Sequence, residues 1–192
     1  MATVVVATGN PGKLDELQAY LGDLGWHLQL KPGDLEIAET GTTFLENARL
    51  KASGVAQATG HWAIADDSGL QVDALKGAPG LYSARYAEND GARIARVLSE
   101  LEGNVERGAQ FVCALALARP DGTIALETQG ICRGEILRAP RGQGGFGYDP
   151  IFYLPQLGQS FAELSPEQKR IHSHRGRAFQ QLLPAFQQIR LD

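Results

Sequence analysis

The sequence predicts a mixed α/β fold, in which helices pack on a β-sheet. A run of β-branched residues over positions 3–7 is followed at once by leucines at helical spacing, which is the order of a strand and a helix. Further strand-like and helix-like segments alternate along the chain, without an internal repeat or a low-complexity tract. The 192 residues, 43% hydrophobic and 21% charged, suffice for one folded domain with a sizeable core.

The individual elements follow from periodicity and from capping residues. β-branched runs and period-two alternation predict strands at residues 3–7, 26–30, 62–65, 111–118 and 124–131. Apolar residues at helical spacing predict helices from about residue 13, over 43–59, over 94–101 and over 179–186. Thr43 and Glu46 have the spacing of a capping box, and Ser165-Pro166 indicates one more helix start.

Composition and charge exclude several classes of protein. The net charge of −4 is not that of a protein that wraps nucleic acid, which usually carries a basic excess. Cys113 and Cys132 are the only cysteines and form no CxxC pair, so we expect two small buried residues in a reducing compartment. No apolar stretch reaches ~18 residues, and the N-terminal segment lacks a basic n-region. A cytoplasmic protein without a membrane span is therefore expected.

The first candidate site is the turn between the first strand and the first helix. Backbone N–H groups at a helix start favour anions, the two glycines allow close approach, and Lys13 adds a positive charge. The turn is not a P-loop, because its glycines are three apart and Leu14 follows the lysine. The segment fits phosphate binding and also fits an ordinary strand–helix turn. Its residues are Thr8, Gly9, Asn10, Pro11, Gly12 and Lys13.

The second candidate site is acidic. Glu39 precedes the helix start at Thr43, and Asp66-Asp67-Ser68-Gly69 follows the strand expected at 62–65, which should end there. Mg²⁺ prefers oxygen ligands and often uses one or two carboxylates together with substrate phosphates. Adjacent acids on a strand point different ways, so we expect one to face a cleft while its neighbour accepts backbone N–H bonds. A polar turn with solvated acids is the alternative, with Glu39 serving the helix dipole.

Two further segments are candidates for holding a nucleotide base. The glycine-rich loop at 144–150 contains Phe146, Tyr148 and Asp149, and aromatic faces stack on nucleobases. Alternatively, the two rings anchor a surface loop to the core. The basic residues before the last helix are suited to phosphate or a base edge, or else form a solvated helix start. They are Lys169, His174 and Arg175, and Lys51, four residues after Asn47, is a candidate to join them. His172 and His174 have no third ligand in view, so a zinc site is not expected.

Taken together, these segments resemble the inosine triphosphate pyrophosphatase family, whose members hydrolyse non-canonical purine nucleoside triphosphates. Five stretches carry the resemblance in chain order, between residues 4 and 179: VVVATGNPGK, AETGTTFLENARLKA, ADDSGLQVDALKGAPGLYSARYA, GGFGYDPIF and SHRGRAF. No motif position departs from the family pattern, whereas residues 88–140 carry little of it.

The resemblance implies a single pyrophosphatase domain over residues 1–192, elongated, with a long bent mixed sheet and an active-site cleft between two lobes. It implies a homodimer and a requirement for Mg²⁺. It places Glu39 and Asp67 at the metal and the water, and residues 8–13 on the triphosphate with Ser68 nearby. The residues that would hold the nucleotide, mostly its base, are Phe146, Gly147, Tyr148, Asp149, Lys169, His174 and Arg175.

The chemistry of these residues suits cleavage of a triphosphate such as ITP, dITP or XTP to the monophosphate and pyrophosphate. Mg²⁺ and lysines offset the negative charge that repels a nucleophile. Asp67 accepts a proton from the attacking water, and no covalent intermediate is required. Donors on Arg175 or His174 match the 6-oxo group of hypoxanthine and xanthine, but face the 6-amino donor of adenine.

Two other functions are compatible with the same scaffold. One is a hydrolase that acts on canonical or pyrimidine nucleotides, which a panel of substrates distinguishes. The other is a nucleotide-binding module without catalysis. The acid pair at 66–67 and Glu39 argue against that module, because a binder needs no carboxylate that activates water.

Overall fold

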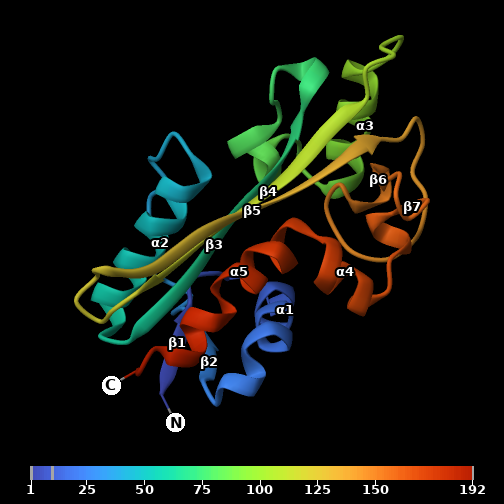
Figure 1. The fold of residues 1–192 in the computed structure, drawn as a ribbon. Coiled ribbons are helices and arrows are strands. Elements are labelled where there is room, and N and C mark those ends of the chain that lie inside the picture. The colour runs from blue at the N-terminus through green and yellow to red at the C-terminus, as the bar shows by residue number, and fades with distance from the viewer. Residues whose placement is uncertain (1, 10, 192) are drawn as a thin grey trace. The chain divides into compact units, whose positions relative to one another are not determined.

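The computed structural model describes residues 2–9 and 11–191 and has the expected mixed α/β fold. Over this part of the chain, one sheet has the strand order β2-β1-β3-β4-β5-β6-β7 (Figure 1). The strands are β1 (Thr3–Val6), β2 (His27–Leu30), β3 (Trp62–Val72), β4 (Gly108–Ala118), β5 (Ile124–Ile136), β6 (Phe152–Leu154) and β7 (Gln159–Ser160). The α-helices are α1 (Pro11–Leu21), α2 (Phe44–Thr59), α3 (Asp90–Glu100), α4 (Pro166–His172) and α5 (His174–Gln188).

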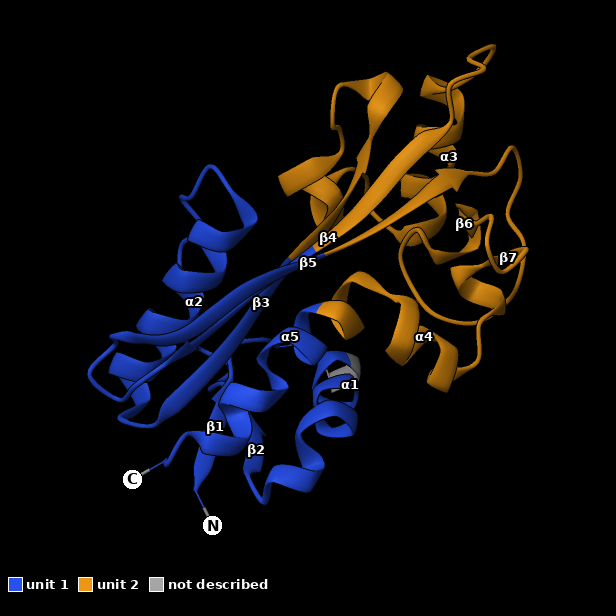
Figure 2. Ribbon diagram, in the orientation of Figure 1, with its two compact units in different colours: residues 1–67, 113–130, 178–192 blue, residues 68–112, 131–177 orange. Residues whose placement is uncertain are grey.

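The chain divides into two compact units (Figure 2). Unit 1 comprises residues 1–67, 113–130 and 178–192, and unit 2 comprises residues 68–112 and 131–177. Strands β3, β4 and β5 each begin in one unit and end in the other. The two lobes that the sequence led us to expect therefore have a counterpart in two units, each with its own core.

Unit 1 is built on parallel strands. β1 pairs in parallel with β2 and with β3, and Val4 lies opposite both Leu28 and Trp62. Helices α1 and α5 lie on one side of these strands and α2 lies on the other (Figure 1). The core against α1 and α5 uses alternate residues of each strand, Val4 and Val6 in β1 for example, because successive side chains of a strand point to opposite faces.

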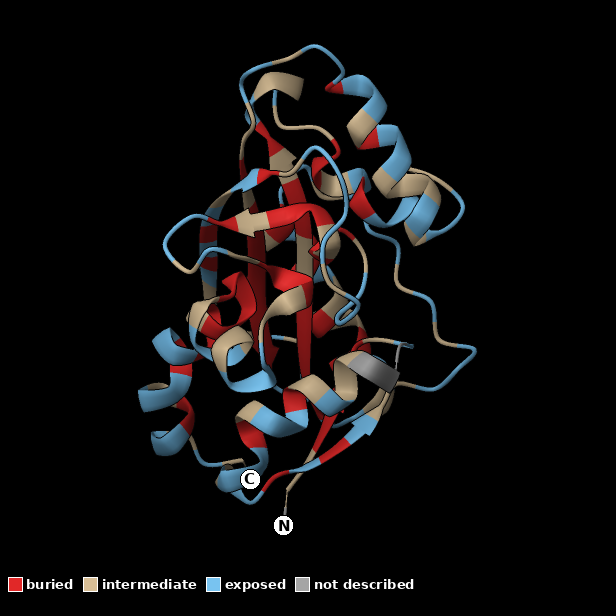
Figure 3. Ribbon diagram, turned by 90° about the vertical axis from the view of Figure 1, so that its right-hand side faces the viewer, coloured by how far each residue is buried: buried red, intermediate tan, exposed pale blue. Residues whose placement is uncertain are grey.

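Unit 2 has antiparallel strands and an aromatic core. β6 pairs antiparallel with β5 and with β7. Phe111, Phe152 and Phe161 contact one another with ring centroids 4.6–5.5 Å apart. Figure 3 shows buried residues along the strands and on single faces of the helices, the pattern expected of helices packed on a sheet.

The expected elements are confirmed, but several of their ends were misplaced: β4 begins at Gly108, β5 runs to Ile136 and α3 begins at Asp90. The strand expected to end at 66–69 continues to Val72, because Leu70 and Val72 are buried in unit 2 and the two aspartates have ammonium partners. Helix α1 begins at Pro11 rather than near residue 13, which suits proline in the first turn of a helix.

The cap of α2 also differs in detail from the expected capping box. The Thr43 side chain accepts from the Glu46 N–H at 3.1 Å, as predicted. The Glu46 carboxylate accepts from the Thr42 N–H at 2.6 Å instead of closing the box on Thr43. In the last helix, Phe179 and Phe186 are buried as expected, but Leu183 is 38% exposed and lies off the buried face.

Candidate active site

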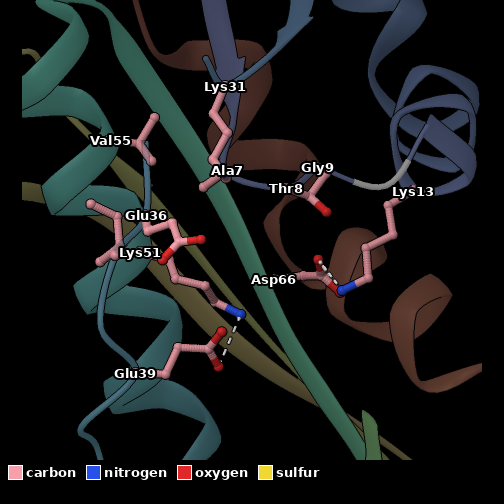
Figure 4. A pocket seen from close by; sticks show the side chains of 11 residues that line it. Ala7, Thr8, Gly9, Lys13, Lys31, Glu36, Glu39, Lys51, Val55 and Asp66 are labelled. Carbon is pink, nitrogen blue, oxygen red and sulfur yellow. Dashed lines mark hydrogen bonds and ion pairs between the residues drawn. The ribbon is translucent and has the colours of Figure 1, made fainter. Parts of the chain in front are cut away.

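A pocket of about 320 Å³ lies in unit 1 where β1 ends and α1 follows. The carboxyl ends of parallel strands are the usual ligand-binding edge of an α/β sheet. Thr8, Gly9 and Lys13 line the pocket, and they come from the turn that was predicted to bind phosphate. Glu39 and Lys51 line it as well (Figure 4). The pocket therefore combines the predicted phosphate turn with part of the predicted acidic site.

Lys13 is held by a buried carboxylate. Its Nζ atom donates to both carboxylate oxygens of Asp66, at 3.0 and 3.1 Å (Figure 4). The Asp66 side chain is only 2% exposed, whereas that of Lys13 is 22% exposed. A charge-assisted pair of this kind restricts the lysine side chain, so its ammonium is directed into the pocket before any ligand arrives.

Lys51 lies between two further carboxylates. Its Nζ atom is 3.0 Å from Oδ1 of Asp67 and 3.7 Å from Oε2 of Glu39. Lys51 was expected to join the basic residues before the last helix, but its observed partners are these two acids. The reason is that α2 packs on the face of the strands to which Asp67 points.

The alternation of β3 explains why adjacent aspartates have different partners. Trp62 and Ile64 face the core of α1 and α5, so Asp66 lies on that face and contacts Lys13. Asp67 lies on the opposite face and contacts Lys51. The prediction that the two acids point apart is confirmed. The expectation that the neighbour of the cleft-facing acid accepts backbone N–H bonds stays a prediction, and the ammonium partner of Asp66 was not foreseen.

Burial and charge shift the proton affinities of this pair. Burial raises the pKa of the Asp67 carboxyl above its usual range, although the nearby Lys51 ammonium acts in the opposite direction. Burial alone would lower the pKa of Lys51, but the carboxylates of Asp67, Asp66 and Glu39 outweigh it, so that pKa is raised. Lys51 stays protonated, and Asp67 is a stronger base than an exposed aspartate.

The donor set around Lys51 suits a hard cation. Two carboxylates, that of Glu39 in the loop before α2 and that of Asp67 on β3, lie close to the Lys51 ammonium. Across residues 2–9 and 11–191, no cluster of three or more His, Cys, Asp or Glu side chains is placed to hold a metal ion. A metal here would take its remaining ligands from substrate or water, which is how Mg²⁺ is commonly bound.

The glycine-rich loop of unit 2 is organised around Asp149. The buried Asp149 carboxylate accepts from the Phe146 N–H at 3.0 Å and from Lys169 Nζ at 2.6 Å. A Cβ atom at Gly145 would lie 2.0 Å from this carboxylate, and its φ is +73°, so glycine is required there. The Lys169 ammonium also lies 4.9 Å from the centroid of the Phe146 ring, which is 46% exposed.

The two aromatic residues of this loop differ in their surroundings. Tyr148 is buried in the core of unit 2, and its hydroxyl donates to the Ser83 carbonyl at 2.7 Å. Burial raises the pKa of Tyr148 to about 12. The interpretation of both rings as core anchors therefore fits Tyr148. It does not fit Phe146, whose exposed ring is available to a flat ligand.

The basic residues at the start of α5 are buried in unit 2. The His174 ring stacks on Phe111, with centroids 4.7 Å apart and planes at 12°. Arg175 is 3% exposed, and its Nη2 atom lies 3.3 Å from Oγ of Ser68. Ser68 was expected near the triphosphate, and Arg175 was expected to bind the nucleotide base. The structure places these two residues next to each other.

Some predicted residues cannot be placed, and some contributors were missed. Asn10 lies outside the described residues, as do the Pro11 side chain and the burial of Gly12, the first two residues of α1. Lys31 and Glu36 line the pocket of unit 1 without having been predicted. Lys31 directly follows β2, and its position at the end of a parallel strand was the one signal available for it.

A model described as the Ham1 family matches residues 4–185, nearly the whole chain. The chain belongs to the Ham1 family.

Curated relatives and solved structures agree with membership of the Ham1 family. A Nostoc protein named dITP/XTP pyrophosphatase is 65% identical over 181 residues, covering 94% of this chain and 92% of the relative. A Synechocystis protein with the same name is 58% identical over 192 residues and covers 100% of this chain and 99% of the relative. The structure of a HAM1 protein from Coxiella burnetii is 43% identical, with a TM-score of 0.91, and covers 98% of this chain and all of that one.

The resemblance inferred from five sequence stretches is thereby confirmed. The two curated relatives carry the name of a pyrophosphatase of non-canonical purine nucleotides, the activity that the resemblance implied. Within the described part of this Ham1-family chain, no helix is long and apolar enough to cross a membrane.

Proposed function

We propose that the chain hydrolyses non-canonical purine nucleoside triphosphates, among them ITP, dITP and XTP, to the monophosphate and pyrophosphate, and that it requires Mg²⁺. The observation that carries this proposal is the pocket of unit 1, where three ammonium groups and three carboxylates accompany a glycine-containing turn at a helix start. The names of the 65% and 58% identical relatives support it.

Phosphate binding is assigned to residues of unit 1. The triphosphate accepts hydrogen bonds at the turn of residues 8–13 and from the Lys13 ammonium, which Asp66 orients. Lys51 adds a second ammonium on the same pocket. These positive charges offset the negative charge that otherwise repels an attacking water.

Proton transfer is assigned to Asp67. Its raised pKa makes its carboxylate a better proton acceptor from the attacking water, and Lys51 keeps the carboxylate in place at 3.0 Å. The water oxygen forms a bond to phosphorus while the bond to the pyrophosphate oxygen breaks. Glu39 and Asp67 would hold Mg²⁺, which, when bound, supplies charge neutralisation at the phosphate oxygens.

Base recognition is assigned to residues of unit 2. The exposed ring of Phe146 offers a stacking surface, and the loop that carries it is fixed by Asp149 and Lys169. His174 and Arg175 provide donors for a 6-oxo purine. Gly147 and Tyr148 complete the loop, Tyr148 by anchoring it to the core.

The test is hydrolysis of ITP, dITP and XTP beside the canonical triphosphates, with pyrophosphate and phosphate both measured. We expect pyrophosphate release from the 6-oxo, non-canonical purines, and its loss when a chelator removes Mg²⁺. Preferential turnover of canonical or pyrimidine nucleotides would favour the second hydrolase hypothesis. Binding without turnover would favour the non-catalytic module.

The same family resemblance supports two further proposals. We propose that the chain forms a homodimer, which light scattering of the purified protein tests by a mass twice that of one chain. We also propose that it acts in the cytoplasm, because its substrates belong to the nucleotide pool that polymerases use.

A further inference from the structure

Asp90, which lies outside every predicted site, contacts the loop that carries Phe146. Asp90 is the first residue of α3, and its Oδ2 atom accepts from the Gly147 N–H at 2.7 Å. The two residues are 57 positions apart in the sequence and both belong to unit 2. The bond therefore ties the start of α3 to the residue that directly follows Phe146.

An acid at the start of a helix usually needs no other explanation than the helix dipole. Here the cap of α3 is already made by Asn89, whose side chain accepts from the Ala92 N–H at 2.9 Å. The Asp90 carboxylate is divided between two other partners, with Oδ2 on Gly147 and Oδ1 on Nη1 of Arg93 at 2.7 Å. The geometry thus points to a role beyond that of a helix-terminal charge.

Arg93 holds the carboxylate from its other side. The Arg93 guanidinium also donates through Nε to the Ala87 carbonyl at 3.1 Å, so it is itself attached to the segment before α3. Asp90 is therefore restrained by a group that is fixed to the backbone. With Oδ1 held by Arg93, the other carboxylate oxygen, Oδ2, is directed at the Gly147 N–H.

Gly147 is the point at which the loop changes direction. Its φ is +61°, in the left-handed region, so the peptide groups on either side of it face different ways. Phe146 precedes it with an exposed ring, and Tyr148 follows it with a buried one. Fixing the Gly147 N–H between these residues fixes how far the Phe146 ring projects from the core.

We propose that Asp90 is a positioning residue for base recognition, which holds the Gly147 N–H so that the Phe146 ring is presented for stacking before the nucleotide binds. The proposal rests on the proposed function, because stacking on Phe146 belongs to it. An ordered loop loses less conformational entropy on binding, so the benefit falls on substrate affinity. The chemical step, assigned to unit 1, does not depend on it.

The experiment compares Asp90→Ala with a control variant, Asp90→Asn, and with Arg93→Gln, which tests the restraint on the carboxylate. Asp90→Asn keeps an oxygen that can accept from Gly147, and Arg93→Gln removes the ion pair while keeping the Asp90 carboxylate. In the full chain, exchange of the Gly147 amide hydrogen is measured by NMR without ligand, and kcat and KM are measured with ITP. Circular dichroism and thermal unfolding verify that each variant is folded.

For Asp90→Ala we expect roughly tenfold faster exchange at Gly147 and a roughly tenfold higher KM, with kcat within about twofold of the wild type. Asp90→Asn should stay close to the wild type in both measurements, whereas Arg93→Gln, which removes the group that restrains the carboxylate, should show a smaller loss in the same direction as Asp90→Ala. Unchanged exchange in Asp90→Ala, an equal loss in Asp90→Asn, or a fall in kcat at constant KM would overturn the proposal.

A further variant, Asp90→Ser, distinguishes loss of the contact from a folding defect. Asp90→Ser keeps a polar group at the helix start but is too short to reach Gly147, so it should reproduce the loss seen in Asp90→Ala. Because exchange is measured without substrate, a chain that exchanges as expected but hydrolyses no ITP would contradict the proposed function and not the contact.

Discussion

The Nζ atom of Lys51 lies 3.0 Å from Oδ1 of Asp67, and both side chains are largely withdrawn from solvent. The pair joins helix α2 to strand β3 within unit 1. It brings together a positive charge for phosphate and a carboxylate for proton transfer, and each group alters the pKa of the other.

Removing Lys51 should shift the pH dependence of activity. Asp67 acts as a base only when ionised, so activity falls as the pH drops through its pKa. Burial already raises that pKa, and the Lys51 ammonium opposes the rise. In Lys51→Met the pKa of Asp67 rises further, so the acid limb of kcat/KM should move to higher pH.

The control for this shift is Arg49→Met on the same helix. Arg49 pairs with Glu127 at 2.6 Å on an exposed part of unit 1, and its removal should leave the profile unchanged. An acid limb that stays in place in Lys51→Met would show that Asp67 is not the group that titrates.

Asp67→Asn should abolish most activity while keeping the fold. The change is nearly isosteric but removes the proton acceptor, and losing a general base typically lowers the rate roughly 10²-fold or more. Steady-state kinetics with ITP measures the loss, and thermal unfolding checks the fold. Asp73→Asn is the matched control, because Asp73 forms an exposed pair with Arg133 in unit 2. Near wild-type turnover in Asp67→Asn would remove Asp67 from the mechanism.

Lys13→Ala should weaken binding of the outer phosphates. We expect roughly a tenfold loss of affinity for a non-hydrolysable ITP analogue and a slower turnover, since a charge-assisted hydrogen bond is lost. Inosine monophosphate serves as the comparison ligand and should bind as before. An equal loss for both ligands would mean that Lys13 does not bind the outer phosphates.

A double variant separates this effect from destabilisation. Lys13→Ala leaves the buried Asp66 carboxylate without this ammonium, and a buried charge without its counter-charge is costly. In Lys13→Ala with Asp66→Asn the negative charge is absent, so stability should recover while triphosphate affinity stays low.

The residues assigned to base recognition should show two different patterns of loss. Phe146→Ala should weaken all purine triphosphates alike, by roughly tenfold, because stacking does not depend on the edge groups of the ring. Arg175→Ala should lower kcat/KM for ITP more than for ATP, because only the 6-oxo base offers an acceptor. The ratio of kcat/KM for ITP and ATP is the quantity to compare.

Arg177→Ala is the matched control for the arginine. Arg177 lies two residues further along α5 and donates to the Ile131 carbonyl at 2.9 Å. Its removal should leave the ITP-to-ATP ratio unchanged. If Arg175→Ala slows both substrates by one factor, Arg175 serves phosphate or catalysis, and the discrimination lies with His174 or Asp149.

The two cysteines should be inert in the folded protein. Both are buried, and burial raises the pKa of the Cys132 thiol to about 11. At pH 8 about one Cys132 in a thousand is then a thiolate, the form that reacts with disulfide reagents. We expect no rapid labelling of native protein and two labelled thiols after denaturation. Rapid native labelling would contradict the burial of these strands.

Local sequence signals predicted the helices and strands well, but they predicted the contacts between distant elements poorly. The Thr43 cap, the helix start at Pro166 and the alternation of Asp66 and Asp67 all depend on neighbours within a few residues, and all were found. The continuation of β3 to Val72 was missed, because the acids at 66–67 interrupt the apolar pattern that marks a strand.

Contacts between distant segments account for the other omissions. The pairing of Lys13 with Asp66 spans 53 positions, and no local pattern indicates it. The role of Asp90 could not be predicted for an additional reason. The helix dipole alone accounts for an acidic residue in the first turn of a helix, so nothing in the sequence indicates a distant partner. The structure supplied what the sequence lacks, which is the distance between α3 and the loop that contains Gly147.

The pleat of β3 makes the number of its residues, as well as their identity, a property that this strand must keep. β3 pairs with β1 in the register Val4 to Trp62 and Val6 to Ile64. Deleting or adding one residue between Trp62 and Ala65 would turn the Asp66 carboxylate toward α2 and the Asp67 carboxylate toward α1. Each lysine would then face the wrong acid, even though no charged residue had been replaced. The stretch from Trp62 to Ala65 is buried along its whole length, so a change of length there could not be absorbed without moving both acids.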